Sequence, residues 1–103
     1  MHLKQVDDDK LICFGVGNCL DNSIEKIKRV SNLTYVCDND SKKWGKEYFG
    51  VKCISPDELK RLSRAVVVIS VYSESVSREI AEQLEGMGVK NIFLIADYLK
   101  CVE

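Results

Sequence analysis

The stretch Leu11-Ile12-Cys13-Phe14-Gly15-Val16-Gly17 decides the fold that the sequence predicts. Four apolar residues precede two closely spaced glycines, and the residues that follow place Leu20, Ile24 and Ile27 at helical spacing. A short buried strand that passes through a glycine turn into an amphipathic helix is typical of the opening unit of an α/β fold. The same alternation of apolar runs and helical segments continues along the rest of the chain.

Five apolar runs are predicted to be the strands of one parallel sheet. With right-handed crossovers they form a five-stranded sheet in the order 3-2-1-4-5, with helices on both faces as a three-layer α/β sandwich. Strands one and four then lie side by side, and ligands of such sheets bind beyond the carboxyl ends of the strands at that point. The runs are Leu11 to Phe14, Leu33 to Cys37, Val51 to Ile54, Ala65 to Val71 and Asn91 to Ile95.

The later helices carry recognisable start and stop signals. Ser55 is the predicted N-cap of the second helix, with Pro56 at its first position and Glu58 completing a capping box. The third helix is expected to end at one of the glycines of Gly86-Met87-Gly88, and a last helix to start near Asp97. The inward stripe of the third helix is predicted to comprise Val76, Ile80, Leu84 and Met87.

Length and composition indicate one globular domain without a nucleic-acid or membrane partner. The 103 residues carry a formal net charge of −1, with 46% hydrophobic and 30% charged residues, which excludes a mainly disordered chain. The chain lacks the basic excess that phosphate neutralisation needs, and its longest uncharged stretch is too short to span a bilayer. We expect a cytoplasmic protein with a polar leader, Met1 to Lys10, that is native or an expression remnant, followed by one domain over residues 11–103.

Cysteine and histidine usage argues against a metal site or a catalytic triad. The five cysteines, at positions 13, 19, 37, 53 and 101, contain no C-x-x-C pair, which fits neither a disulfide framework nor a zinc site. Cys13 and Cys37 lie in apolar runs and are expected to be small buried residues. His2 is the only histidine, so no catalytic residue is assigned.

The glycine turn and an aspartate indicate a site for a phosphate-bearing ligand. Gly15 and Gly17 let backbone N–H groups approach an anion at a helix N-terminus. Asp38 follows the second strand, 21 positions after Gly17, where a carboxylate can bind ribose hydroxyls and Asn39 can assist it. Leu20 stands where the dinucleotide fingerprint has a third glycine. The alternatives are a tight turn without ligand and an aspartate that only closes its own turn.

Further polar residues are predicted at the same end of the sheet. Ser70, Tyr72 and Ser73 surround the end of the fourth strand and the start of the third helix, and Asn18 opens the first helix. They are candidates for a ligand pocket opposite the glycine turn, with helix N-capping as the alternative role for at least one of Ser73 and Ser75. Lys43, with Lys42 and Lys46, is interpreted either as solvated surface or as a phosphate neutraliser.

Short motifs over nearly the whole chain, about Lys10 to Leu99, share the pattern of a known group of modules. The motifs are residues 11–17, Val36-Cys37-Asp38-Asn39-Asp40, Lys43-Trp44-Gly45 with Phe49-Gly50-Val51, Ile54-Ser55-Pro56-Asp57-Glu58-Leu59, and Gly86-Met87-Gly88-Val89. The pattern resembles small Rossmann-like modules of polysaccharide and nucleotide-sugar metabolism enzymes. Examples are the N-terminal nucleotide-sugar-binding domain of sugar acetyltransferases and the CoA-binding-like domain of nucleotide-sugar dehydratases.

The resemblance implies a nucleotide-binding module without a complete active site of its own. In the acetyltransferase relatives, the residues that match Gly15, Gly17 and Asp38 hold the nucleotide part of a sugar substrate, and catalysis belongs to a separate β-helix domain. A nucleotide-sugar is therefore the implied ligand, with NAD(P) or CoA as alternatives, and a catalytic domain or subunit of a sugar-modifying enzyme is the implied partner. Leu20 departs from the dinucleotide motif, which argues against tight NAD binding.

The sequence is also compatible with two other functions. One is an NAD(P)-binding oxidoreductase or redox-sensing domain that uses the same site. The other is a protein-interaction module whose ancestral pocket is empty, and a homo-oligomer is compatible with all three functions.

Overall fold

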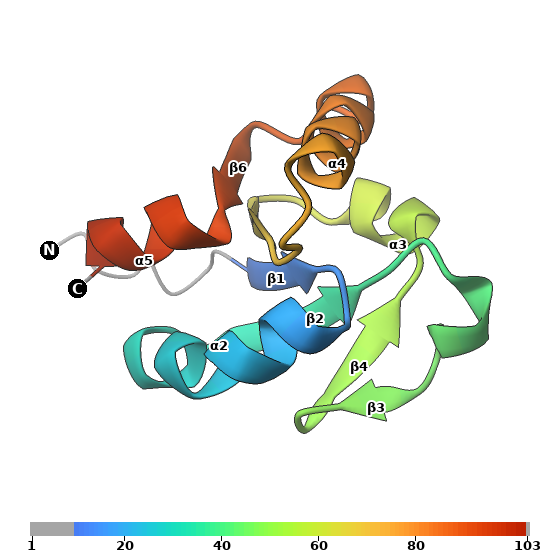
Figure 1. Cartoon of the computed structure of the whole chain (residues 1–103). Coiled ribbons are helices and arrows are strands. Elements are labelled where there is room, and N and C mark those ends of the chain that lie inside the picture. Colours follow the sequence, from blue (N-terminus) through green and yellow to red (C-terminus); the bar gives the residue numbers. More distant parts are fainter. Residues whose placement is uncertain (1–9, 103) are drawn as a thin grey trace, which may run out of the picture.

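A mostly parallel sheet of six strands lies at the centre of the computed structural model, which describes residues 10–102 (Figure 1). The strands lie in the order β3-β4-β2-β1-β5-β6, and only β3 runs antiparallel to its neighbour. They are β1 (Lys10–Phe14), β2 (Leu33–Cys37), β3 (Glu47–Tyr48), β4 (Val51–Ile54), β5 (Ala65–Ile69) and β6 (Asn91–Leu94). The α-helices in residues 10–102 are α2 (Asn18–Val30), α3 (Pro56–Arg61), α4 (Glu74–Gly86) and α5 (Ile95–Val102), with a 3-10 turn, η1, at Ser41–Lys43.

The expected sheet of five strands was wrong in strand number, and its order differs because β3 occupies one edge. β3 forms an antiparallel hairpin with β4. Phe49 and Gly50 join the two strands with φ of 55° and 84°, positive values of the kind that a two-residue hairpin loop needs. A strand of two residues is too short to produce a periodic pattern. The remaining strands are parallel, and β1 and β5 lie side by side.

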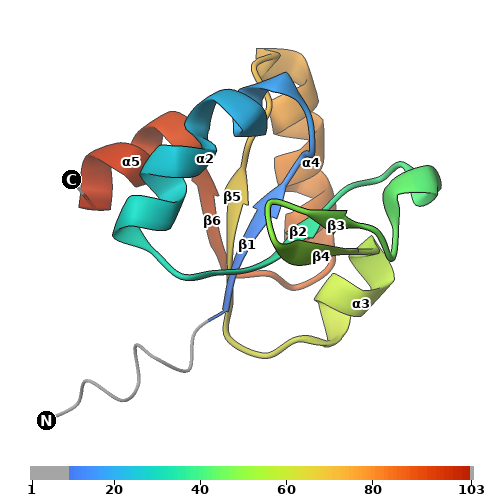
Figure 2. The same ribbon diagram turned by 90° about the horizontal axis from the view of Figure 1, so that it is seen from below.

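Helices cover both faces of the sheet (Figure 2). Successive side chains of a strand point to opposite faces, so Leu11 and Cys13 of β1 pack in the cluster that contains α2 and α5 residues. Ile12 and Phe14 pack in the other cluster, which contains α3 and α4 residues. The two apolar faces explain why the strands read as nearly continuous apolar runs. The predicted α/β class is confirmed.

The first two predicted helices form as the sequence indicates. Leu20 and Ile27 of α2 are fully buried. Ser55 is the N-cap of α3, and its Oγ accepts a hydrogen bond from the Glu58 N–H at 3.2 Å. Leu59, one turn later, is buried against the sheet. The capping motif and the apolar spacing therefore predicted both helices correctly.

The third predicted helix differs from expectation at its start. Ile80 and Leu84 are buried, whereas Val76 is 40% exposed. Val76 lies in the first turn of α4, where it lines a cavity beside Gly15 and Asp38 instead of covering the sheet. The helix ends at Gly86, and Gly88 has a φ of 89°, as the glycine signal predicted.

Several boundaries shift by one or two residues. β1 begins at Lys10, which the sequence analysis assigned to the leader; the other leader residues, 1–9, lie outside the described residues. β5 ends at Ile69, not Val71, and β6 ends at Leu94, because α5 begins directly at Ile95. None of the helices in residues 10–102 has the length and apolar character that a membrane crossing needs.

Candidate functional site

The two glycines of the turn after β1 have different roles. Gly15 has a φ of 112°, and a Cβ there would lie 2.8 Å from Val71 Cγ2 and 2.9 Å from the Ser70 carbonyl oxygen. Glycine is therefore needed for the turn to pass the end of β5. Gly17 has an extended φ of −164°, and a Cβ there would meet nothing within 4 Å. Packing within the described residues does not require glycine at position 17, and the space in front of it is open.

The open space lies at the start of α2. Gly17 is the N-cap of this helix of 13 residues and has no side chain with which to cap it. α3 and α4, by contrast, are capped by the hydroxyls of Ser55 and Ser73. The first N–H groups of a helix have no partner within the helix and carry partial positive charge. The start of α2 therefore offers donors to an acceptor that reaches the turn.

The carboxylate of Asp38 lies against the glycine turn. Its Oδ2 accepts a hydrogen bond from the Val16 N–H at 2.8 Å, and its Oδ1 accepts one from the Asp40 N–H at 2.9 Å. The second hydrogen bond closes the local turn at Asp38, which was the alternative role expected for this aspartate. The first joins the end of β2 to the turn after β1. Each carboxylate oxygen can accept about two hydrogen bonds, so both retain acceptor capacity.

Lys43 belongs to the same cluster and is not merely solvated surface. Its Nζ donates a hydrogen bond to the Val16 carbonyl oxygen at 2.6 Å and lies 3.7 Å from Asp38 Oδ2. The 3-10 turn at Ser41–Lys43 brings this lysine back over the turn. The adjacent Trp44 donates its indole N–H to the Asp38 carbonyl oxygen at 2.7 Å. The charge of the carboxylate is therefore partly balanced by a fixed ammonium group.

The polar residues after β5 mostly position the backbone. Ser70 is 2% exposed, and its Oγ lies within hydrogen-bonding distance of the carbonyl oxygens of Phe14 and Gly15, at 3.1 and 2.9 Å. Ser73 accepts a hydrogen bond from the N–H of Val76. It thus has the helix-capping role that was expected as the alternative to ligand binding. Tyr72, 68% exposed, accepts one at its hydroxyl from the Asn22 side chain of α2. Tyr72 is thus the residue of this group with the most surface available to a ligand.

A cavity of about 310 Å³ brings nearly all the predicted site residues together. Val16, Cys19 and Val71 complete its lining. Asn39 is the exception: it pairs with Gln83 of α4 through two side-chain hydrogen bonds, 3.0 and 2.9 Å, and lines a neighbouring cavity of about 300 Å³. The predicted residues that line the first cavity are Gly15, Gly17, Asn18, Asp38, Ser70, Tyr72 and Ser73.

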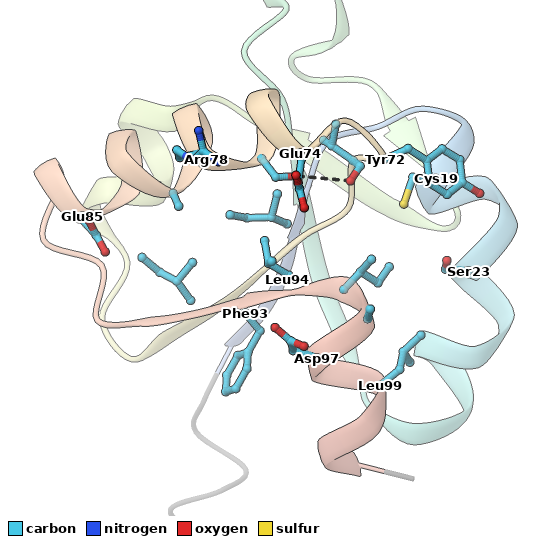
Figure 3. A pocket seen from close by; sticks show the side chains of 17 residues that line it. Cys19, Ser23, Tyr72, Glu74, Arg78, Glu85, Phe93, Leu94, Asp97 and Leu99 are labelled. Carbon is cyan, nitrogen blue, oxygen red and sulfur yellow. Dashed lines mark hydrogen bonds between the residues drawn. The ribbon is translucent and has the colours of Figure 1, made fainter.

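A larger cavity, about 860 Å³, was not predicted from the sequence (Figure 3). It lies between the first half of α2, one side of α4, and the segment where β6 passes into α5. Its lining shares Cys19, Val71 and Tyr72 with the smaller cavity, so the two adjoin. Two features of the sequence bear on this cavity, the exposed side of α4 and the absence of charged residues in β6. Neither has a residue spacing that identifies a pocket.

One protein family matches most of the chain. The family described as C2185-like, N-terminal, matches residues 7–93. The chain belongs to the C2185-like N-terminal family. No curated protein matches the chain. The matched segment of this C2185-like N-terminal domain contains the glycine turn, Asp38, and the strands from β1 to Phe93 in β6.

The buried cysteines of the C2185-like N-terminal domain have raised pKa values. Cys13 and Cys37 are fully buried, as predicted. Burial raises the pKa of Cys13 to about 12, and it raises the pKa values of Cys37, Cys19 and Cys53 as well. The thiolate is the nucleophilic form, so these thiols are poor nucleophiles at neutral pH. Cys19, 4% exposed, lies at the junction of the two cavities.

Proposed function

We propose that this chain is a Rossmann-like nucleotide-binding module that binds a phosphate group at the start of α2 and a ribose beside Asp38. The observation that supports the proposal is the cavity of about 310 Å³, which is lined by both Gly17 and Asp38. The space in front of Gly17 is open, because a Cβ there would meet nothing within 4 Å. The cavity lies beyond the carboxyl ends of β1 and β5, two adjacent central strands. Ligands of open α/β sheets bind at such positions.

The charge of Asp38 in the cavity, and of Lys43 beside it, fits a ribose phosphate. Asp38 is an acceptor for ribose hydroxyl donors, and Lys43 reduces the repulsion between this carboxylate and a nearby phosphate. Val16 contributes no free N–H because Asp38 already accepts it. The phosphate would therefore bind to the N–H groups at the start of α2, next to Gly17.

The size of the cavity limits what it can hold alone. A volume of about 310 Å³ lies at the lower end of the range for small-molecule sites. It suits the phosphate and ribose portion of a ligand, and the rest must extend beyond it. We infer that the ligand is a nucleotide-sugar or a related phosphate-bearing molecule, with NAD(P) or CoA as the alternatives.

The module is proposed to serve a catalytic domain or subunit of a sugar-modifying enzyme. The buried thiols have raised pKa values, which argues against thiol redox chemistry in the core. The description of the family as an N-terminal domain fits a module that works together with further protein.

Thermal unfolding with single ligands tests the proposal. UDP-glucose, NAD⁺, NADPH, CoA and S-adenosylmethionine would each be added at about 1 mM to the full chain. A ligand at about 100 times its dissociation constant stabilises the fold by about 2.7 kcal/mol. This raises the midpoint of a domain of this size by roughly 10 °C or more. We expect such a shift with a nucleotide-sugar.

A pair of glycine variants locates the binding. Gly17→Val places a side chain in the open space before α2 and should abolish the ligand-induced shift with little change in the unliganded midpoint. Gly86→Val is the matched control, because a Cβ there also meets nothing within 4 Å and the residue lies at the far end of α4. An unchanged shift in Gly17→Val, or no shift with any nucleotide, contradicts the proposed site.

A further inference from the structure

The cavity of about 860 Å³ adjoins the proposed phosphate site and is large enough for a complete ligand group. Cys19, Val71 and Tyr72 line both cavities. A molecule with its phosphate at the start of α2 can therefore continue past these residues into the larger cavity. The two cavities are therefore adjoining compartments of one site.

The inner surface of the larger cavity is mostly apolar. Its lining includes Ile69 at the end of β5 and a continuous segment, residues 92–96, that runs from β6 into α5. Phe93 packs edge-on against Tyr98 of α5, with ring centroids 5.6 Å apart, which fixes this part of the lining. Leu94 is 44% exposed. A ligand group that covered this segment would remove apolar surface from water.

Charged residues of mainly one sign surround the apolar surface (Figure 3). Glu74 and Glu85 of α4 and Asp97 of α5 are acidic, and Arg78 is the one basic residue lining the cavity. All four are exposed. An anionic group placed here would face three carboxylates, whereas an uncharged or cationic group would not be repelled.

We propose, building on the proposed nucleotide function, that the larger cavity binds the second group of a diphosphate-linked ligand, and that this group is uncharged or cationic. The group contacts the cavity largely through an apolar surface. The chemistry is shared by a neutral hexose, which has an apolar ring face, and by an oxidised nicotinamide ring, which is flat and cationic. Anionic second groups, such as a uronic acid, are selected against by Glu74, Glu85 and Asp97.

Calorimetric titration of the full chain with matched ligands tests the proposal. One series is UDP, UDP-glucose and UDP-glucuronate, and the other is ADP and NAD⁺. In whichever series binds, the ligand with the neutral or cationic second group should bind about tenfold or more tightly than the ligand without it, because filling an apolar pocket yields discrimination of this order. UDP-glucuronate should bind more weakly than UDP-glucose, with the difference decreasing at high salt.

Two variants assign the effect to the larger cavity, and a third serves as the control. Ala96→Trp and Ala81→Phe add bulk at residues that line only this cavity and not the phosphate site. Both should remove the gain from the second group and leave UDP or ADP binding unchanged. Ala96 is exposed, so its variant should fold normally even if Ala81→Phe does not. Ser63→Trp is the control, because Ser63 is exposed and lines a separate cavity near Leu59 and Gly88.

The outcomes separate this proposal from the proposed function. Equal affinity for UDP and UDP-glucose, and for ADP and NAD⁺, would overturn the role of the larger cavity and leave the phosphate site intact. Equal affinity for UDP-glucose and UDP-glucuronate would overturn the charge selection. Absence of binding by every ligand would reject the nucleotide function itself. Self-association in sedimentation runs that Ala96→Trp abolishes, without ligand preference, would assign the surface to a second copy of the chain and overturn the proposal.

Discussion

Replacing Gly15 with alanine should destabilise the fold strongly, whereas the same change at Gly17 should not. At Gly15 a Cβ would lie 2.8 Å from a Val71 methyl group and 2.9 Å from the Ser70 carbonyl oxygen, at a φ of 112°. Contacts below 3.0 Å force a shift, and the backbone oxygen at the end of β5 cannot rotate away. The unfavourable φ costs about 1–3 kcal/mol, and the overpacking about 1–3 kcal/mol more.

The expected loss for Gly15→Ala is therefore about 2–6 kcal/mol of unfolding free energy, a large share of the roughly 5–15 kcal/mol that holds a domain folded. The midpoint of thermal unfolding should fall by at least about 8 °C. Gly17→Ala should stay within about 1 kcal/mol of the original chain, because its φ is extended and the space is empty.

Urea unfolding followed by circular dichroism measures both variants under identical conditions. The reasoning is refuted if Gly15→Ala unfolds within about 1 kcal/mol of the original chain. It is also refuted if Gly17→Ala loses as much stability as Gly15→Ala, because that would mean that the space before α2 is not open.

Three further perturbations follow from the contacts described. Asp38→Ala leaves the Val16 N–H without its acceptor and should lower the unfolding free energy by about 1–3 kcal/mol in urea titrations, even without ligand; an unchanged value would mean that this hydrogen bond contributes nothing. Ser55→Ala removes the N-cap of α3 and should cost about 1 kcal/mol in the same assay, with no loss contradicting the capping contact. Cys13, whose pKa burial raises from 9.0 to about 12, keeps its proton in the folded state at pH values where an unfolded thiol ionises. It therefore stabilises the fold fully below pH 9 and less as pH rises from 9 towards 12, by up to about 1.4 kcal/mol per pH unit. Cys13→Ala should flatten this alkaline decline. An equal slope in the variant and the original chain would argue against a buried neutral thiol at Cys13.

The sequence predicted the elements that depend on local patterns and missed those that depend on tertiary contacts. Apolar spacing identified α2, and the Ser55 and Pro56 pair identified α3, because caps and amphipathic faces are local properties. The β3 strand has only two residues and exists because β4 pairs with it. Val76 fitted the helical stripe of α4, but it lies beyond the part of the sheet that the stripe covers.

Most of the predicted site residues lie together around one cavity. The glycine turn, Asp38 and Tyr72 line one cavity, because the carboxyl ends of parallel strands meet at one edge of the sheet. The contact of Lys43 with Val16 was not predictable, since it requires the chain to fold back through the 3-10 turn. The larger cavity depends on the direct passage of β6 into α5, a boundary that apolar periodicity cannot locate.

The bracing of the glycine turn by both neighbouring strands has a kinetic consequence. The Gly15 N–H donates to the Cys37 carbonyl oxygen of β2 at 2.8 Å, and Ser70, after β5, holds the carbonyl oxygens of Phe14 and Gly15. For the proposed phosphate-bearing ligand, a turn held by these hydrogen bonds should need little rearrangement, so little conformational entropy should be lost on binding. Association should then proceed in a single step whose rate rises linearly with ligand concentration, without the plateau that a slow preceding isomerisation produces.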